Sequence, residues 1–387
     1  MAVTLASELK LPCGAVLPNR LAKAAMTEGL ASPDGRPTPE LERLYGLWAD
    51  GGSGMLLSGN IIVDADHLER PGNVVIDREP DAGMQARLAR WAAAATRQGN
   101  HFWAQISHGG RQTQKLVNPH PKSSSDVAVA LPGGQFGKPT PLTKTEIADL
   151  VERWALAARV CKDAGFTGVQ VHGAHGYLIH QFLSSSANQR DDTYGGSLEN
   201  RMRFAVEVGA AVREEWPQDK PVFFRLSAVD GKGGSWRLTD SIALAKALRV
   251  VDIDVADVSS GGVTGSSDMP MVPRIPAYQA SFSGRIRHEA KIKTVAVGGI
   301  TTAKQAEDIL QAGDADIIAM ARELLWNADW PAHAAEALGV DDPFSYLPTG
   351  YAHRLRLREA QKTMDINQDQ NIIAKSLRYF LDDSTSS

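Results

Sequence analysis

The chain has 387 residues, of which 43% are hydrophobic and 22% charged, and its formal net charge of −4 disfavours nucleic acid as a partner. No apolar run approaches the ~18 residues of a membrane-spanning helix, and the N-terminus lacks the pattern of a secretory signal. Cys13 and Cys161 are too few for a disulfide scaffold or a four-cysteine iron–sulfur cluster, so we expect a cytoplasmic protein without membrane contact.

Short apolar runs alternate with helical patterns along most of the chain. After a hairpin at about 11–17, strands are predicted at 21–26, 54–61, 102–107, 168–171, 222–226, 255–258, 294–297 and 317–320. Helices are predicted at 39–50, 82–99, 143–164, 197–216, 239–250, about 278–290 and 303–312. The helix at 143–164 has the clearest start, because Thr143 and Glu146 have the spacing of a capping box.

Eight short apolar strands separated by helices predict an α/β fold, a closed (β/α)8 TIM barrel rather than an open doubly wound sheet. A barrel needs ~250 residues, and the excess falls in the N-terminal hairpin, in long βα loops and in a C-terminal extension. We therefore expect a single domain over 1–387, with a barrel core at about 20–330 and the extension at 331–387. The tail at 382–387 has the composition of a disordered segment.

Polar residues gather where the predicted strands end. In a barrel, these C-terminal strand ends form the mouth that carries the chemistry. The polar side chains at or just past the strand ends are Thr27, Gln105, His108, His172, His175, Tyr177, Arg225, Ser259 and Arg322, and the glycine pairs Gly261-Gly262 and Gly298-Gly299 lie at the same level.

His172, His175 and Tyr177 follow the fourth of these strands and form the most informative group. Two imidazoles can donate hydrogen bonds to one carbonyl oxygen, and a phenol can deliver a proton nearby. A metal site is the alternative interpretation, but two histidines need at least a third ligand, and none stands at an obvious companion spacing. The group favours polarisation of a conjugated carbonyl, and we expect no metal.

Other mouth residues are less specific. Gly298, Gly299 and Arg322 follow the last two strands, where barrels often bind a phosphate, although a tight turn and a surface arginine are the simpler interpretation. Arg225 ends an apolar strand, so it needs either a structural ion pair or a ligand anion. The Gln105 amide either hydrogen-bonds the edge of a bound heterocycle or hydrogen-bonds a side chain of another strand.

The residues around the two histidines closely resemble the signature of the old yellow enzyme family. The signature runs through 172–183, Asn188-Gln189-Arg190-Asp191-Asp192, Tyr194-Gly195-Gly196-Ser197 and Glu199-Asn200-Arg201, with support from Pro18-Asn19-Arg20, 105–111, Arg225-Leu226-Ser227, 297–301 and 321–325. The family consists of flavin-dependent ene-reductases, also called NADH:flavin oxidoreductases, built on a (β/α)8 barrel that holds FMN. The resemblance covers about 11–330.

The resemblance implies a role for each matching residue. His172 and His175 would bind the oxygen of the substrate, and Tyr177 would protonate its α-carbon. The implied FMN contacts are Gln105 and Arg225 at the pyrimidine end, Ala24, Ala25, Met26 and Thr27 along the flavin, Gly59 near the ring, and Gly298, Gly299, Ala321 and Arg322 at the phosphate. Thr27 stands where one branch of the family has Thr and another has Cys. Gly29 stands where the cysteine branch has a tyrosine that contacts the substrate.

The implied activity is the reduction of activated C=C bonds of α,β-unsaturated carbonyl compounds, by hydride transfer from N5 of non-covalent FMN, with NADH or NADPH as co-substrate. Action on nitro compounds or amines is an alternative on the same scaffold. A non-redox lyase or aldolase that binds a phosphate is an alternative from another class, and it would want a Schiff-base lysine such as Lys23. The loops at 112–142 and 265–283 are expected to set specificity for a small enone-type substrate. A homo-oligomer is left open, because the C-terminal segment differs from that of the cysteine branch.

Overall fold

The computed structural model describes residues 3–129, 133–231, 235–262, 272 and 275–363. Among these residues, eight parallel strands close into a barrel, because the last strand, β13 (Ile317–Met320), pairs with the first, β3 (Leu21–Lys23). The others, in order around the barrel, are β4 (Met55–Ile62), β6 (His101–Ser107), β9 (Gly168–Gly173), β10 (Val222–Ser227), β11 (Val255–Ser259) and β12 (Lys293–Val297). The (β/α)8 architecture predicted from the sequence is confirmed.

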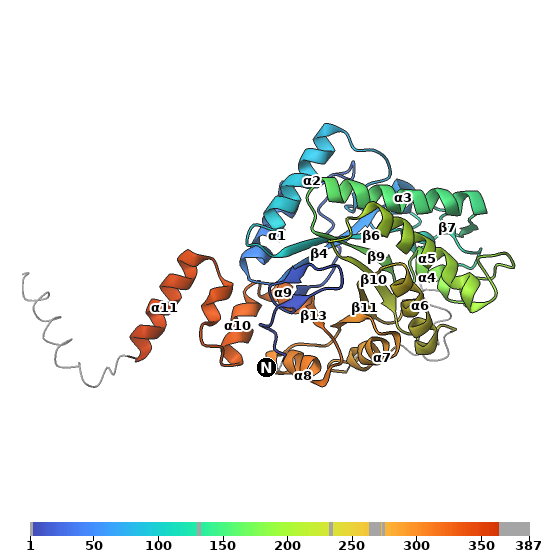
Figure 1. The fold of residues 1–387 in the computed structure, drawn as a ribbon. Coiled ribbons are helices and arrows are strands. Elements are labelled where there is room, and N and C mark those ends of the chain that lie inside the picture. Colours follow the sequence, from blue (N-terminus) through green and yellow to red (C-terminus); the bar gives the residue numbers. More distant parts are fainter. Residues whose placement is uncertain (1–2, 130–132, 232–234, 263–271, 273–274, 364–387) are drawn as a thin grey trace, which may run out of the picture.

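Helices surround the barrel (Figure 1). They are α1 (Pro39–Asp50), α2 (Ala82–Ala95), α3 (Lys144–Asp163), α5 (Leu198–Glu215), α6 (Leu238–Val250), α7 (Ala280–Ala290) and α8 (Ala303–Ala312). The C-terminal segment adds α9 (Arg322–Trp326), α10 (Trp330–Ala337), η3 (Pro343–Tyr346) and α11 (Thr349–Thr363), and α11 reaches away from the barrel. No helix in the described part of the chain is long and apolar enough to cross a membrane.

The N-terminal hairpin closes the lower end of the barrel. Its strands are β1 (Leu9–Lys10) and β2 (Val16–Leu17), which pair antiparallel. Leu17 is fully buried in one cluster with Trp103 and Phe223, whose rings lie 4.0 Å apart inside the barrel. A second, larger apolar layer fills the space between strands and helices. The end of the barrel formed by the N-terminal ends of the strands is therefore packed with protein. The end formed by the C-terminal ends of the strands is left for chemistry.

Two predicted elements end early. The first strand was predicted to reach Met26, but β3 ends at Lys23, whose ammonium is fully buried and donates to the Leu57 carbonyl at 2.7 Å. The helix predicted to reach Gly99 ends at Ala95, because the Asn100 side chain donates to the Ala95 carbonyl at 2.7 Å. At the end of β3, the Lys23 side chain bonds a carbonyl of the neighbouring strand β4. At the end of α2, the Asn100 side chain bonds the carbonyl of the last helical residue.

Short elements fill the long loops. They are η1 (Ala65–His67), β5 (Val74–Val75), η2 (Gly110–Gln112), β7 (Lys122–Ser123), β8 (Thr140–Pro141) and α4 (Leu178–Leu183). The loop at 265–283, expected to set specificity, lies partly outside the described residues, as do three residues of the loop at 112–142 and the tail at 382–387.

Candidate active site

His172, His175 and Tyr177 converge at the mouth of the barrel. The ring centroids of His172 and His175 lie 5.1 Å apart, and those of His172 and Tyr177 lie 5.0 Å apart, both pairs edge to face. His172 stands near the end of β9, and Tyr177 directly precedes α4. Sequence spacing alone suggested this grouping, and the structure places the three rings together.

Both imidazoles are held in the neutral form. Burial, followed by the nearby His175 and Arg225, lowers the pKa of His172 well below its usual value, and burial followed by Arg225 does the same for His175. The Ala174 N–H donates to His172 Nδ1 at 3.2 Å, so the ring proton of His172 lies on Nε2. Within the described part of the chain, the only hydrogen bond of the His172 ring is the one at Nδ1, so the Nε2–H can donate to a ligand.

His175 has an uncommon backbone conformation. Its φ of +59° is in the left-handed region, which costs of the order of 1–2 kcal/mol for a residue with a Cβ. Its N–H donates to Ser227 Oγ at 3.0 Å, and the Gln112 amide donates to its carbonyl at 2.6 Å. Gly262 packs so closely that a Cβ there would lie 2.2 Å from the His175 Cα. The ring Nε2 of His175 lies 2.6 Å from Ser259 Oγ. Residues of neighbouring strands therefore fix both the backbone and the ring of His175.

A hydrogen-bonded chain of polar side chains crosses the mouth. Arg225 Nη1 donates to Gln105 Oε1 at 3.4 Å, and Gln105 Nε2 donates to Asn60 Oδ1 at 2.7 Å. Asn60 Nδ2 in turn donates to Glu69 Oε2 at 2.6 Å, and Thr27 Oγ1 donates to the same oxygen at 2.5 Å. Glu69 also lies near Tyr177, because after burial its charge is the next cause that raises the pKa of the Tyr177 phenol. Glu69 thus links the first strand's loop to the expected proton donor.

Sequence reasoning missed Asn60 and Glu69. Asn60 lies inside an apolar strand, and Glu69 lies seven residues past the end of β4, beyond the reach of a rule about strand ends. Asp257 was also missed, and its Oδ2 lies 3.5 Å from Arg225 Nε inside the barrel. Burial raises the pKa of Asp257 even though Arg225 opposes that shift. Alternation within the strands was the one available signal, and it does not separate a structural from a functional polar residue.

The residues predicted to contact a cofactor lie on both sides of β3. The predicted phosphate contacts follow β12 and β13 on one side, and Gly59 lies in β4 on the other side. Ala25, Met26 and Thr27 are half-buried, and Ala24 is buried, with its N–H donating to the Met320 carbonyl. Gly298 and Gly299 have φ of +99° and +69° directly after β12, and Ala321 and Arg322 follow β13, the strand paired with it. Gly59 lies inside β4, where a Cβ would meet Glu28 Oε2 at 2.3 Å and the Met26 carbonyl at 2.5 Å.

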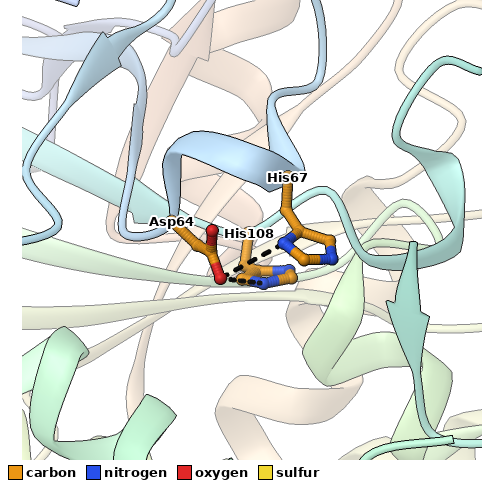
Figure 2. A group of neighbouring side chains, drawn as sticks. All are labelled: Asp64, His67 and His108. Atoms are coloured by element: carbon orange, nitrogen blue, oxygen red, sulfur yellow. Dashed lines mark ion pairs between the residues drawn. The ribbon is translucent and has the colours of Figure 1, made fainter. Parts of the chain in front are cut away.

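A buried Asp–His–His cluster stands beside the mouth, formed by Asp64, His67 and His108 (Figure 2). His67 Nδ1 and His108 Nε2 lie 3.2 and 3.7 Å from Asp64 Oδ2. The Lys122 N–H donates to His67 Nε2, and the Gly110 N–H donates to His108 Nδ1. A neutral ring that accepts on one nitrogen carries its proton on the other. Both protons therefore face Asp64, so the cluster does not offer the lone pairs that a metal ion needs there.

Two other features bear on the alternatives. A hollow of about 750 Å³ lies at the opposite, N-terminal end of the strands, lined by residues such as Cys13, Arg213 and Lys293, and is remote from the His–His–Tyr group. Lys23, the lysine that a Schiff-base mechanism would use, is fully buried against the rings of Tyr45 and Trp48 of α1. Its ammonium does not reach the mouth, which disfavours the lyase or aldolase alternative.

The family model, the related sequences and the solved structures that this chain resembles agree with one another. The model of the NADH:flavin oxidoreductase / NADH oxidase family matches residues 13–340. An NADPH dehydrogenase from Geobacillus sp. (strain WCH70) is 38% identical over 292 residues, which cover 73% of this chain and 80% of that protein. The old yellow enzyme homologue from Zymomonas mobilis has a TM-score of 0.73 at 26% identity, covering 90% of this chain and 98% of the other. Morphinone reductase in complex with tetrahydroNAD has a TM-score of 0.72 at 26% identity, covering 89% and 94%.

Proposed function

Since the chain belongs to the NADH:flavin oxidoreductase / NADH oxidase family and is an NAD(P)H-dependent flavin oxidoreductase with FMN as cofactor, we propose that it reduces the activated C=C bond of α,β-unsaturated carbonyl compounds. The observation that carries the proposal is the convergence of two neutral imidazoles and a phenol at the barrel mouth. Such a set suits a substrate whose oxygen gains negative charge during the reaction.

The mouth fits FMN by the chemistry of its donors. Arg225 is 7% exposed; its Nε pairs with Asp257 Oδ2 at 3.5 Å inside the barrel, and its Nη1 donates to Gln105 Oε1. A guanidinium beside the Gln105 amide supplies the donors and the acceptor that the pyrimidine edge of a flavin requires. We assign Gln105, Arg225 and the 24–27 segment to the ring, and Gly298, Gly299, Ala321 and Arg322 to the phosphate. Bound FMN supplies hydride transfer, a chemistry that the side chains of the mouth lack.

The protein's own contribution is to bind and polarise the substrate. His172 Nε2–H donates to the carbonyl oxygen, and His175, fixed by Ser227 and Ser259, completes the pocket for that oxygen. Because both rings are neutral, they donate without giving up a proton to bulk solvent as the pH changes near neutrality. Removal of one such donor typically costs 10²–10³-fold in rate. An unactivated alkene has no oxygen to bind, so it should not react.

Binding of a phenol tests this role of the histidines, because a phenolate mimics the enolate that the pocket would stabilise. The H172A/H175A double variant should bind a phenol at least ~10-fold more weakly, the loss expected for hydrogen bonds to a charged acceptor. Kd is measured from the long-wavelength absorbance band that phenols produce on the flavoprotein. The His333→Ala variant is the matched control, since His333 is exposed on α10. An unchanged Kd in the double variant, with FMN still bound, would refute the assignment.

Separate measurement of the two half-reactions tests Tyr177. Tyr177→Phe should slow reoxidation of the enzyme by an enone by ~10²-fold or more, the usual contribution of a general acid. Bleaching of the flavin by NADPH should change little, because that step needs no proton donor at the carbon. Stopped-flow absorbance resolves both steps. Equal slowing of the two half-reactions would make Tyr177 a structural residue.

A further inference from the structure

An ion pair inside the barrel joins Arg225 to a carboxylate that the proposed reduction does not use. Asp257 of β11 stands opposite Arg225 of β10 in the strand register, and its Oδ2 lies 3.5 Å from Arg225 Nε. Both residues are buried, with 1% of Asp257 and 7% of Arg225 exposed. Of the described residues, Asp257 is the one carboxylate that pairs with Arg225.

Asp257 and Gln105 together fix the direction of the Arg225 guanidinium. Nε faces Asp257, and Nη1 donates to Gln105 Oε1 at 3.4 Å. A guanidinium is planar, so two fixed nitrogens also fix the direction of the third, Nη2. Among the described residues Nη2 has no hydrogen-bond acceptor, so it can donate to a ligand. Asp257 is itself held from β9, because Gln170 Nε2 donates to its Oδ2 at 3.0 Å.

Stability alone does not explain this ion pair. Asp257 Oδ1 and Gln170 Oε1 are buried without a hydrogen-bond partner in the part of the chain that the structure describes. Burial of such unpaired polar atoms destabilises a fold, and apolar side chains of similar volume often replace a buried ion pair without loss. The carboxylate therefore points to a requirement for negative charge beside Arg225.

We propose that Asp257 is a positioning residue for the flavin, which acts through Arg225 and holds the reduction potential of bound FMN below the value that Arg225 alone would set. The proposal rests on the assignment of Arg225 to the flavin ring made above. The pyrimidine end of a flavin gains negative charge on reduction, so a cation beside it favours the reduced state. A carboxylate paired with that cation offsets part of its field.

A lower potential acts in opposite directions on the two halves of the cycle. It makes reduced FMN a stronger hydride donor to an enone and oxidised FMN a weaker hydride acceptor from NADPH. Asp257 therefore shifts driving force from reduction of the flavin to reduction of the substrate. Because Asp257 and Arg225 lie in the barrel interior, where charges are screened less than at the surface, loss of one of the two charges should be measurable at the ring.

Arg225 and Gln170 favour the ionised form of Asp257 against the effect of burial. Burial is the largest cause and raises the pKa of Asp257, whereas the charge of Arg225 and the hydrogen bond from Gln170 lower that pKa. Burial also keeps His172 and His175 neutral, so neither imidazole adds a positive charge beside the pair. Only an ionised Asp257 can lower the potential, so a substitution that removes its charge tests the proposal.

The reduction potential of bound FMN is measured on the FMN-bound enzyme by anaerobic equilibration with a redox dye of known potential, followed by absorbance. Asp257→Asn keeps the size of the side chain and an oxygen for Gln170 but removes the charge. We expect the preference for reduced over oxidised FMN to rise at least ~10-fold, which is about 30 mV for a two-electron couple. Asp254→Asn is the matched control, because Asp254 is buried directly before β11, at the opposite end of that strand, and pairs with Arg213 at 3.4 Å. Its potential should equal that of the wild type.

Two results would overturn the role of Asp257: an unchanged or lower potential in Asp257→Asn, or an equal rise in Asp254→Asn. If Asp257→Asn does not retain FMN, Gln170→Leu carries the test. Loss of the hydrogen bond from Gln170 disfavours the ionised carboxylate, so the potential should rise in the same direction. No rise in Gln170→Leu, or loss of FMN from this variant as well, would make the ion pair structural and overturn the proposal.

Reduction of an enone by NADPH, measured on the wild type, separates this proposal from the proposed function. Enone reduction together with an unchanged potential in Asp257→Asn would overturn only the role of Asp257. A raised potential in Asp257→Asn together with a wild type that reduces no enone would overturn the proposed function and leave the role of Asp257 standing.

Discussion

Asp230 shows how one buried side chain supports the reactive loop without entering the mouth. His180 Nε2 lies 2.9 Å from Asp230 Oδ1, and both side chains are fully buried. His180 Nδ1 accepts from the Gly176 N–H at 2.9 Å, which ties the pair to the residue between His175 and Tyr177. Ser184 Oγ also donates to Asp230 at 2.6 Å. The sequence placed His180 in a short helix, but its partner fifty residues away carried no local signal.

Asp230→Ala should destabilise the protein strongly. Removal of one partner of a buried pair leaves the other polar group without compensation and costs about 3–5 kcal/mol. The free energy of unfolding is measured with guanidinium chloride. Asp308→Ala is the matched control, since Asp308 pairs with Lys304 on the exposed face of α8, and its loss should cost less than ~1 kcal/mol. Equal losses in the two variants would contradict the role of Asp230.

Helix α3 shows what a local sequence signal can predict at the scale of an element. Thr143 Oγ1 accepts from the Glu146 N–H at 3.2 Å, and Glu146 Oε2 accepts from the Thr143 N–H at 2.7 Å, so the predicted capping box is confirmed. Glu146 also pairs with Lys122 of β7 at 2.6 Å, which ties the helix start to the long loop. Caps depend on residues three apart, and for that reason sequence predicts them well.

Loss of this cap should have a modest and local cost. Thr143→Ala removes an N-cap acceptor and should lower the free energy of unfolding by about 1 kcal/mol, within a usual range of about 0.5–2 kcal/mol. Thr145→Ala is the control within the same turn, because Thr145 is exposed and makes no cap contact, and it should change stability by less than ~0.5 kcal/mol. Guanidinium chloride unfolding compares the two, and a larger loss in Thr145→Ala would rule out the cap as the cause.

At the scale of the whole molecule, the alternation of strands and helices along the chain predicted the barrel. It did not predict the contacts between side chains at the mouth. Eight strands and the family resemblance are confirmed, because apolar runs and the His172–Tyr177 signature are written in contiguous residues. The closing pair β13–β3 followed only from counting. The early end of β3 and the position of Glu69 depend on contacts between distant segments, such as Lys23 with Leu57 and Glu69 with Thr27. No periodicity encodes such contacts.

The buried imidazoles should make the stability of the whole protein fall on acidification. The pKa values of His172 and His175 lie well below the ~6.5 of an unfolded chain. Below pH ~6.5 the unfolded state therefore binds more protons than the native state, and each such group lowers the free energy of unfolding by about 1.4 kcal/mol per pH unit. Asp254 and Asp257, whose pKa values burial raises, act in the opposite sense, so the two histidines must be isolated by substitution.

Comparison of the wild type with an H172Q/H175Q variant isolates them. Glutamine is polar but does not titrate, so the variant should lose less stability between pH 6.5 and pH 5, by up to ~2.7 kcal/mol per pH unit for the two groups. Both proteins are unfolded in guanidinium chloride with the same excess of FMN at each pH, because a ligand that binds the native state adds to its stability. Parallel slopes would mean that the rings are protonated in the native protein. The assignment of neutral imidazole donors at the mouth, on which the proposed carbonyl chemistry depends, would then be wrong.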